Sequence, residues 1–445
     1  MDVPDVKYAR SGNVAIAYQV VGDGPLDLVF IRGTLAELLT AWEQPLWVRQ
    51  IEGFASFSRV IMFDKRGTGL SDRVREVPNL ETRMDDIRAV LDDLHVDQAV
   101  LWTAQAGSQL ALLFAATYPE RTTGLTLYQP KARGVWAEDY PWGKSEDDWR
   151  KELREAEARW GERSYLIGRL RHSPTVADDP AFQDWYVRYM RRSASPGAAA
   201  AFIRMEMEGD VREVLASVRA PTLVAHGPKS ADESRFIANS IPGADVIEIE
   251  GLRDDFSWAN PSANDVLVEE TARFLERLGP RPAPDRVLAT VLFTDIVGST
   301  QLAAELGDSE WRRLLERHHA LVRRQLGAFR GEEVDTAGDG FFATFDGPAR
   351  AITCAGAIRD EVRALGLEIR AGLHTGECEL GGGKVAGIAV NVGSRIAAAA
   401  APGEVLVSQT VKDLVAGSGI EFEERGEHEL KGVPGSWRLY AVVRA

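Results

Sequence analysis

The chain has 445 residues, enough for two or three domains of ordinary size. Hydrophobic residues make up 45% of it and charged residues 27%, a balance that excludes a disordered or fibrous protein. The formal net charge is −15, so no broad positive field attracts nucleic acid or an anionic membrane, and we expect neither as a partner.

Two features of the chain favour a reducing compartment. Only two cysteines occur, Cys354 and Cys378, too few for a disulfide framework. The N-terminal residues lack the basic and then apolar pattern of a signal peptide. We therefore predict a cytoplasmic protein.

Residues 1–279 alternate short apolar runs with helical periods, which predicts an α/β domain with a parallel sheet covered on both faces. Residues 134–217 interrupt this alternation with polar, Trp-rich helical patterns, and we predict a helical lid there. The expected strands lie at 26–32, 59–64, 99–103, 122–128, 222–226 and 244–249.

A proline-rich spacer is predicted at 280–285, because its three prolines cannot continue the helix that ends near Leu278. Residues 286–445 then show the order β-α-β-β-α-β, which predicts a ferredoxin-like α+β domain with appended elements. Its expected strands lie at 287–294, 332–336, 341–345 and 368–374, with short strands at 404–407, 420–424 and 437–443. Its expected helices lie at 301–306, 309–329, 348–365 and 389–400.

Three segments of the first half, 30–33, 64–72 and 99–118, resemble the α/β-hydrolase fold. In that family a sharp turn of sequence G-x-S-x-G projects a nucleophilic serine. Here the turn at 103–107 reads T-A-Q-A-G, so the nucleophile's position holds Gln105, whose amide has no nucleophilic oxygen.

The other two positions of the hydrolase triad also differ from the family pattern. The acid's position falls on the segment 227–230, which contains Lys229, and the histidine's position, judged by its spacing to Trp258, is Asp255. With neither nucleophile nor base, the resemblance implies a scaffold without the usual acyl-transfer chemistry.

Two interpretations of this first domain remain. Asp232, Asp254 or Asp255 could serve a different hydrolysis, or the domain is a structural or ligand-sensing module. We favour the second interpretation, with a small apolar ligand as the expected occupant of a pocket beneath the lid.

The second half places a carboxylate at the end of its first strand. The segment 293–300 reads F-T-D-I-V-G-S-T, so Asp295 is followed by a small-residue turn and a helix start whose N–H groups can cradle phosphate oxygens. A second carboxylate, Asp339, lies in the tight turn A-G-D-G-F at 337–341. If this hairpin lies beside the first strand, the two carboxylates can share divalent cations of the Mg²⁺ type.

Two further segments carry polar side chains in a suggestive arrangement. Asn391 and Arg395 are four residues apart on an expected helix and therefore share one face. Taken alone, this pair is typical of a solvated arginine and a cap-like asparagine. Lys431 follows in the segment E-L-K-G-V at 429–433.

These four blocks, in this order over about 286–443, resemble the class III nucleotidyl cyclase catalytic domain. The hydrolase-like domain in front makes the chain similar to the mycobacterial two-domain adenylyl cyclases. The resemblance implies that Asp295 and Asp339, with Ile296, bind two Mg²⁺ or Mn²⁺ ions. It implies that Asn391 orients the ribose of ATP, that Arg395 stabilises the transition state and that Lys431 binds the triphosphate, while Phe293, Gly298, Ser299 and Thr300 contribute to substrate binding. In the family the metal aspartates and the Asn/Arg pair come from different protomers, which implies a head-to-tail homodimer.

One pair of residues departs from the adenylyl cyclase pattern. The positions that usually hold a lysine and an aspartate for reading adenine are Asp335 and Lys384 here, so the two charges are exchanged. The exchanged pair could preserve the adenine contacts, could read guanine through O6 and N1–H, or could form a surface salt bridge that does not touch the base. We favour adenine on the family resemblance.

Other reactive side chains have structural interpretations. His318 and His319 belong to a charged helical pattern, and we expect both to be solvated. Cys354 is expected to pack inside the domain, and His374 and Glu377 to be strand-end residues and not metal ligands.

Three functions remain in competition. The first is an enzyme that makes cyclic AMP, with the hydrolase-like domain as scaffold or sensor. The second is a silent nucleotide- or small-molecule-binding module, and the third is an esterase whose cyclase half is regulatory. Gln105 argues against the third.

Overall fold

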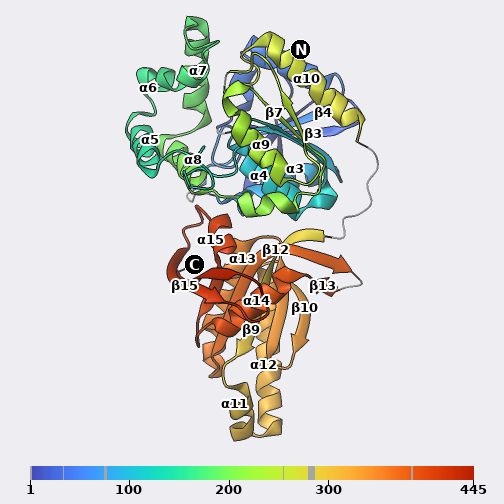
Figure 1. Ribbon diagram of the computed structural model, residues 1–445, viewed down its shortest axis with the longest axis vertical. Coiled ribbons are helices and arrows are strands. Elements are labelled where there is room, and N and C mark those ends of the chain that lie inside the picture. Colours follow the sequence, from blue (N-terminus) through green and yellow to red (C-terminus); the bar gives the residue numbers. More distant parts are fainter. Residues whose placement is uncertain are drawn as a thin grey trace. The chain divides into compact units, whose positions relative to one another are not determined.

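The computed structural model describes residues 3–33, 35–74, 78–253, 255–278, 286–381 and 384–444, except for the side chains of residues 380, 381 and 384. The chain divides into two compact units, Met1–Ala283 and Pro284–Ala445 (Figure 1). The spacer predicted at 280–285 lies outside the described residues.

The first unit is built on an eight-stranded sheet of order β1-β2-β4-β3-β5-β6-β7-β8. The strands from β4 to β8 in this order are parallel to one another, whereas β1 and β2 form an antiparallel edge that the sequence analysis missed. The strands are β1 Lys7–Ser11, β2 Val14–Val21, β3 Asp27–Ile31, β4 Arg59–Phe63, β5 Ala99–Ala104, β6 Thr122–Tyr128, β7 Thr222–His226 and β8 Asp245–Glu248.

Helices cover both faces of this sheet (Figure 1). The helix α2 packs against α10, and α3 packs against α4. Every residue of α4 is buried, which explains why its sequence, G-S-Q-L-A-L-L-F-A-A-T, has no polar face. The helices are α1 Leu38–Ala41, α2 Pro45–Ala55, α3 Leu80–Asp93, α4 Gly107–Thr117, α9 Ala231–Ser240 and α10 Pro261–Glu276.

Four further helices stand between β6 and β7, in the segment where we predicted a lid. Three of them begin with a proline or an acidic turn after a capping side chain: Ser145 caps α5, Asp179 caps α7 and Ser195 caps α8. The four helices are α5 Glu146–Arg159, α6 Arg163–Gly168, α7 Pro180–Ser193 and α8 Pro196–Glu208, and the 3₁₀ turn η2 Arg169–His172 follows α6.

The second unit contains a sheet of order β10-β11-β9-β12-β14-β16-β15, with β13 paired to β12. The strand β12 is longer than predicted because it pairs with β9 over eleven positions, from Ile369 to Glu379. The strands are β9 Arg286–Ile296, β10 Glu332–Ala337, β11 Gly340–Phe345, β12 Ile369–Gly381, β13 Lys384–Ala386, β14 Val405–Ser408, β15 Glu421–Glu429 and β16 Ser436–Arg444.

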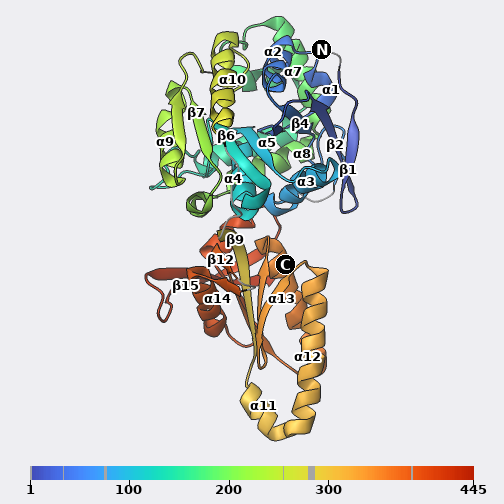
Figure 2. The same ribbon diagram turned by 90° about the vertical axis from the view of Figure 1, so that its right-hand side faces the viewer.

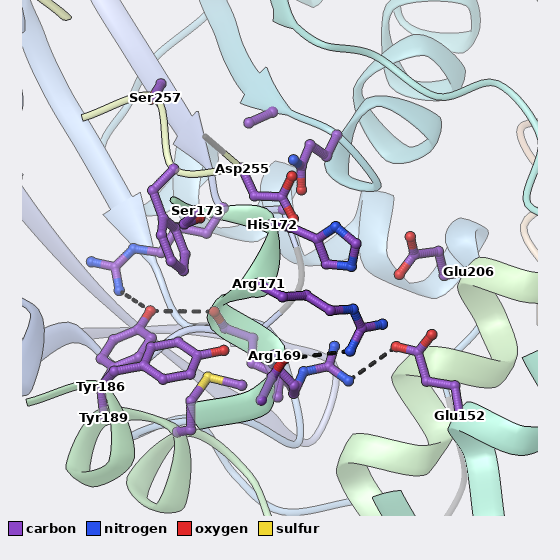
Figure 3. A pocket seen from close by; sticks show the side chains of 18 of the residues that line it. Glu152, Arg169, Arg171, His172, Ser173, Tyr186, Tyr189, Glu206, Asp255 and Ser257 are labelled. Atoms are coloured by element: carbon purple, nitrogen blue, oxygen red, sulfur yellow. Dashed lines mark hydrogen bonds and ion pairs between the residues drawn. The ribbon is translucent and has the colours of Figure 1, made fainter. Parts of the chain in front are cut away.

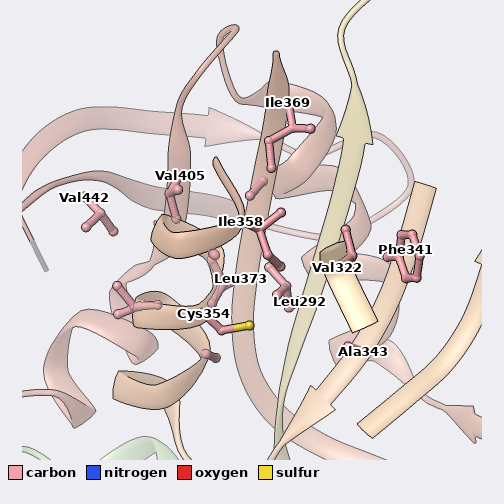
Figure 4. Packing of buried hydrophobic residues seen from close by; sticks show 14 of the residues in the cluster. Leu292, Val322, Phe341, Ala343, Cys354, Ile358, Ile369, Leu373, Val405 and Val442 are labelled. Atoms are coloured by element: carbon pink, nitrogen blue, oxygen red, sulfur yellow. The ribbon is translucent and has the colours of Figure 1, made fainter. Parts of the chain in front are cut away.

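Helices also cover both faces of the second sheet. Adjacent residues of β9 enter different clusters: Leu292 packs with residues of α12 and α13, whereas Val291 packs with Ala389 of α14. Figure 2 shows α13 and α14 on either side of the sheet, and Figure 4 shows the main cluster around Leu292 and Ile358. The helices are α11 Ser299–Leu306, α12 Asp308–Ala328, α13 Pro348–Val362, α14 Ile388–Ala399 and α15 Gln409–Leu414.

Burial contradicts one expectation and agrees with another. His318 is completely buried on the inner side of α12, so the prediction that it is solvated is wrong. Cys354 is buried in the cluster of Figure 4, as its apolar neighbours suggested. Among the helices that the structure describes, none has the length and apolar character that crossing a bilayer requires.

Candidate active site

The structure brings Asp295 and Asp339 together at one end of the second sheet. Asp295 is the penultimate residue of β9, and Asp339 lies in the turn between β10 and β11. Because Phe341 of β11 pairs with Thr294 of β9, this turn lies beside the strand end. The backbone N–H of Ile296 donates a hydrogen bond to Oδ2 of Asp339 at 3.3 Å, which ties the turn to the residue after Asp295.

Small residues leave space around the two carboxylates. Gly338, with φ of +66°, allows the tight turn, and a Cβ built on Gly340 would lie 3.8 Å from Oδ1 of Asp295. Carboxylate oxygens are hard donors that suit Mg²⁺ or Mn²⁺, which complete their coordination with water and substrate phosphates. Among the described residues no group of three or more His, Cys, Asp or Glu gathers around a point, so a metal here would depend on substrate oxygens.

Arg370 of β12 is a neighbour of the site that sequence reasoning missed. Its Nη2 and Nε contact Oδ2 of Asp295 at 2.6 and 3.1 Å, and Oδ1 faces the space left by Gly340. The residue is 75 positions from Asp295, and it meets Asp295 because β9 and β12 pair in register there. The sequence held no local signal for this contact.

A cavity of about 300 Å³ opens beside Asp295. Phe293 and Phe342 stack with their ring centroids 4.5 Å apart on its wall. Asp335 also lines the cavity, and its carboxylate accepts a hydrogen bond from the N–H of Thr336. The helix α14 contributes a further part of the wall through Ser394, Ala397 and Ala398.

The predicted phosphate loop follows β9 directly. Gly298 has φ of +64° and is the N-cap residue of α11, so the N–H groups of Ser299 and Thr300 belong to the first helical turn, where no preceding carbonyl of the helix accepts them. The Ile296 side chain is buried in the core, so this residue offers only its backbone to the site.

Asn391 and Arg395 project from the exposed face of α14, whereas Val392 and Ile396 of the same helix are buried. Neither Asn391 nor Arg395 belongs to the lining of the cavity beside Asp295. Lys431 is exposed in the turn between β15 and β16. The structure thus places Asp339 beside the strand end that carries Asp295, with Asp335 in the cavity next to Asp295, but it leaves these three side chains facing solvent. The side chain of Lys384 lies outside the described residues.

Two histidines of α12 support the turn that carries Asp339. The Nε2 of His319 lies 3.0 Å from the carbonyl oxygen of Gly338, and both His318 and His319 contact the ring of Phe341. Burial lowers the pKa of His318 to about 4, so the ring is neutral at physiological pH.

The first unit keeps the backbone of a hydrolase turn. Gln105 has φ of +49°, a left-handed conformation that is rare for a residue with a side chain. A Cβ on Gly107 would lie 2.2 Å from Oγ1 of Thr103, so the turn is closely packed. Gln105 nevertheless presents an amide, and Lys229 is exposed on a separate 3₁₀ turn after β7. Of the three acids considered for other chemistry, Asp232 and Asp255 are exposed, and Asp254 lies outside the described residues.

A cavity of about 710 Å³ lies between this turn and the lid helices (Figure 3). Asp255, His172 and Glu206 point into it from different segments, and Lys131 lines it as well. Partial desolvation inside the cavity raises the pKa of Asp255 against the opposing charges of Lys131 and His172, and it lowers the pKa of His172. The lining is therefore more polar than the prediction of a small apolar ligand assumes. His172 reaches the cavity from the lid, and no motif in the sequence indicated it.

Comparison with known proteins agrees with this division into two units. Residues 284–444 match the family model described as the adenylate and guanylate cyclase catalytic domain. The pH-sensitive adenylate cyclase MT1302 of Mycobacterium tuberculosis (strain CDC 1551 / Oshkosh) is 26% identical over 312 residues, which cover 65% of this chain and 77% of that protein. The AB hydrolase superfamily protein YisY of Bacillus subtilis (strain 168) is 27% identical over 173 residues, 38% of this chain and 63% of that protein.

A solved structure, the bromoperoxidase from Bacillus anthracis, matches 61% of this chain and 100% of its own length, with 18% identity and a TM-score of 0.53. A further curated relative from Rhizobium meliloti (strain 1021) is 29% identical over 157 residues, and the match spans only 27% of that protein. The first unit thus has an α/β-hydrolase-like fold, and the second unit of the chain carries an adenylate and guanylate cyclase catalytic domain.

Proposed function

We propose that the protein is a nucleotidyl cyclase that converts ATP to 3′,5′-cyclic AMP and pyrophosphate. The observation that carries the proposal is the meeting of Asp295 and Asp339 at the end of β9, inside a domain that matches the cyclase family model. The relative MT1302 is named an adenylate cyclase, which favours ATP over GTP as the substrate.

Two divalent cations bound by these carboxylates would lower the pKa of the ribose 3′-hydroxyl and neutralise the departing pyrophosphate. The chain's own residues bind and orient the nucleotide. The N–H groups of Ser299 and Thr300 at the start of α11 are oriented to donate to phosphate oxygens, and the helix terminus favours their negative charge.

We further propose that the active site forms between two copies of the chain. Asn391 and Arg395 are exposed on α14, and no hydrogen bond or ion pair of Arg395 with another described residue is seen. An unpaired arginine on the face that also carries Asn391 is suited to donate to a nucleotide held by the carboxylates of a second copy. A guanidinium aimed at charge that develops on the α-phosphate can contribute several kcal/mol, on the order of 3.

We propose that Asp335 and Lys384, the pair with exchanged charges, select the base of the nucleotide. Asp335 lines the cavity beside Asp295 and can accept from the 6-amino group of adenine, with Lys384 donating to N1. A guanylate cyclase is the second candidate, because the same two side chains could instead pair with N1–H and O6 of guanine.

The purified full-length protein, incubated with ATP or GTP and Mn²⁺, tests these proposals when the products are resolved by chromatography and mass spectrometry. We expect cyclic AMP as the main product and its loss in Asp295→Asn. Asp97→Asn, which removes an exposed carboxylate of the first unit, is the matched control and should keep full activity. Cyclic GMP as the main product would reassign the base, and no cyclic product from either nucleotide would refute the function.

Mixing two inactive variants tests the shared site. Asp295→Asn and Arg395→Ala each lack activity alone under this proposal. A one-to-one mixture should regain about a quarter of the native activity, because half of the dimers are mixed and each mixed dimer has one intact site. A mixture as inactive as its components would exclude a site shared between copies.

A further inference from the structure

The strand β10 contains one extra residue just before the turn that carries Asp339. Glu333 of β10 pairs with Ala343 of β11. Asp335, two residues further along β10, pairs with Phe342, only one residue away along β11, so Val334 is the extra residue of a β-bulge. In a regular strand, residues two apart lie on the same face of the sheet. Without the bulge, Glu333 and Asp335 would therefore share one face.

The two sides of the bulge face different parts of the second unit. Ala343 belongs to the main cluster with residues of α12 (Figure 4), and its partner Glu333 faces the same way. Phe342 packs in the cluster on the α14 face of the sheet, and its partner Asp335 lines the cavity beside Asp295. The bulge thus turns the side chain of Asp335 away from α12 and into the cavity.

On the α12 face, a set of side chains connects the two sides of the bulge. The carboxylate of Glu333 accepts from Nε and Nη2 of Arg323 on α12 at 2.7 and 2.8 Å, so this ion pair is bidentate. Oε1 of Glu333 also accepts from the hydroxyl of Thr336, beyond the bulge, at 2.7 Å. The backbone N–H of Thr336 donates to Oδ1 of Asp335 at 2.9 Å. Hydrogen bonds therefore lead from α12 through Glu333 and Thr336 to the carboxylate in the cavity.

The exposure of this network indicates what it contributes. The hydrogen bonds from Arg323 and from the hydroxyl of Thr336 lower the pKa of Glu333 to about 2, so the carboxylate is ionised at physiological pH. The side chains of Arg323 and Glu333 are 52% and 29% exposed, and an ion pair this accessible adds little to the stability of a fold. A bidentate pair nevertheless fixes the direction of both side chains. The network is therefore suited to orient β10, with little effect on global stability.

We propose that Arg323, Glu333 and Thr336 are positioning residues, which hold the bulge of β10 and so keep Asp335 in the cavity where it selects the base. The inference rests on the proposed cyclase function and on the reading of the base by Asp335. A strand that slips by one residue sends its side chains to the opposite face, and the network opposes such a slip at Asp335. Its loss should lower the discrimination between ATP and GTP more than it lowers turnover.

Steady-state kinetics of the full-length protein with ATP, GTP and Mn²⁺ test this proposal. The measured quantity is the selectivity, which is kcat/KM for the preferred nucleotide divided by kcat/KM for the other. Asp335→Ala sets the scale, and we expect it to lower the selectivity by about tenfold. Arg323→Met and Glu333→Gln should each lower it by at least about threefold, and a smaller loss in both would refute the proposal.

A neighbouring arginine of the same helix provides the matched control. Arg324 is also exposed on α12, but it pairs with Glu361 of α13, on another side of the helix from β10. Arg324→Met should therefore keep the native selectivity. A loss in Arg324→Met as large as in Arg323→Met would show that any removed charge on α12 has this effect, which would overturn the assignment.

A double-mutant cycle tests whether the network acts through Asp335. The double variant Arg323→Met/Asp335→Ala should have the selectivity of Asp335→Ala alone, because a residue that only positions Asp335 has no effect once that side chain is gone. A further loss in the double variant would reveal another route and overturn the proposal. A native selectivity in Asp335→Ala would overturn it as well, together with base reading by this residue, but would leave the formation of cyclic AMP intact.

Hydrogen–deuterium exchange with peptide mass spectrometry examines the bulge without turnover. In the absence of nucleotide, peptides covering 332–337 should exchange faster in Arg323→Met and Glu333→Gln than in the native protein and in Arg324→Met. The urea unfolding curves of all these variants should match the native curve. Native exchange of 332–337 in Arg323→Met and Glu333→Gln would refute the positioning role whether or not the protein forms a cyclic nucleotide. No cyclic product from the native protein would instead refute the proposed function.

Discussion

Each unit presents a sharp turn at the end of a buried strand, and the two turns differ in what they carry. After β5, Gln105 retains the left-handed backbone of a nucleophile turn but offers an amide. At the end of β9, Asp295 lies beside the hairpin turn that carries Asp339 and lines the cavity described above. Both units therefore have the backbone turn of an active site, whereas only the second unit has side chains, the two carboxylates, that can take part in catalysis.

The largest effect is expected from Asp339→Ala. Loss of one of two cation-binding carboxylates should lower the rate of cyclic nucleotide formation by at least about 100-fold, since it weakens the preorganised electrostatics of the site. The measurement is the initial rate with saturating ATP and Mn²⁺. The urea unfolding curve of the same variant should match that of the native protein, and a loss of both rate and stability would indicate general misfolding and not a site effect.

An effect of intermediate size is expected on the stability of the second unit at acid pH, because this unit contains the buried His318. The pKa of His318 falls from its ordinary value of 6.5 to about 4 on folding, so its neutral ring stabilises the folded state fully above about pH 6.5. This stability is lost as the pH falls from 6.5 towards 4, because the unfolded chain binds the proton more tightly. We expect the His318→Leu variant to lose about 1 to 3 kcal/mol less of its free energy of unfolding on acidification than the native protein.

Urea unfolding of the full-length protein at pH 7.5 and at pH 4.5 checks this prediction. His428→Leu, on the partly exposed strand β15, is the control and should leave the pH dependence unchanged. The prediction is wrong if His318→Leu loses as much stability on acidification as the native chain.

We expect the smallest effect on activity when the missing nucleophile of the first unit is restored. Gln105→Ser restores the nucleophile of the hydrolase pattern, but Asp255 and Lys229 still stand where a histidine and an acid are required. We expect hydrolysis of p-nitrophenyl acetate to stay within about twofold of the native protein. A burst of p-nitrophenol, with the acyl group attached to the introduced hydroxyl, would contradict this and reveal that another base, such as His172, completes the site.

The sequence predicted those features that depend on local patterns. Strands buried on both faces read as apolar runs, and the capping residues and prolines indicated the helices. The approach of Asp339 to Asp295 was predictable, because a tight turn between two short strands fixes where its aspartate lies. The edge strands β1 and β2 were missed, although β1 alternates in burial towards its end.

Contacts that depend on packing between distant segments could not be predicted. Arg370 meets Asp295 only through the register of β9 and β12, and His172 reaches the first-unit cavity only because the lid folds over it. The burial of His318 was also missed, because arginines and glutamates on both sides of it suggested a solvated helix. One face of α12 nevertheless packs on Phe341 and the core.

The most direct test of the central claim is a crystal structure of the protein with Mn²⁺ and a non-cyclisable ATP analogue, with the manganese located by anomalous scattering. Our account predicts manganese between the carboxylates of Asp295 and Asp339 and the phosphates of the analogue. Nucleotide bound elsewhere, or no manganese at these two carboxylates, would contradict it.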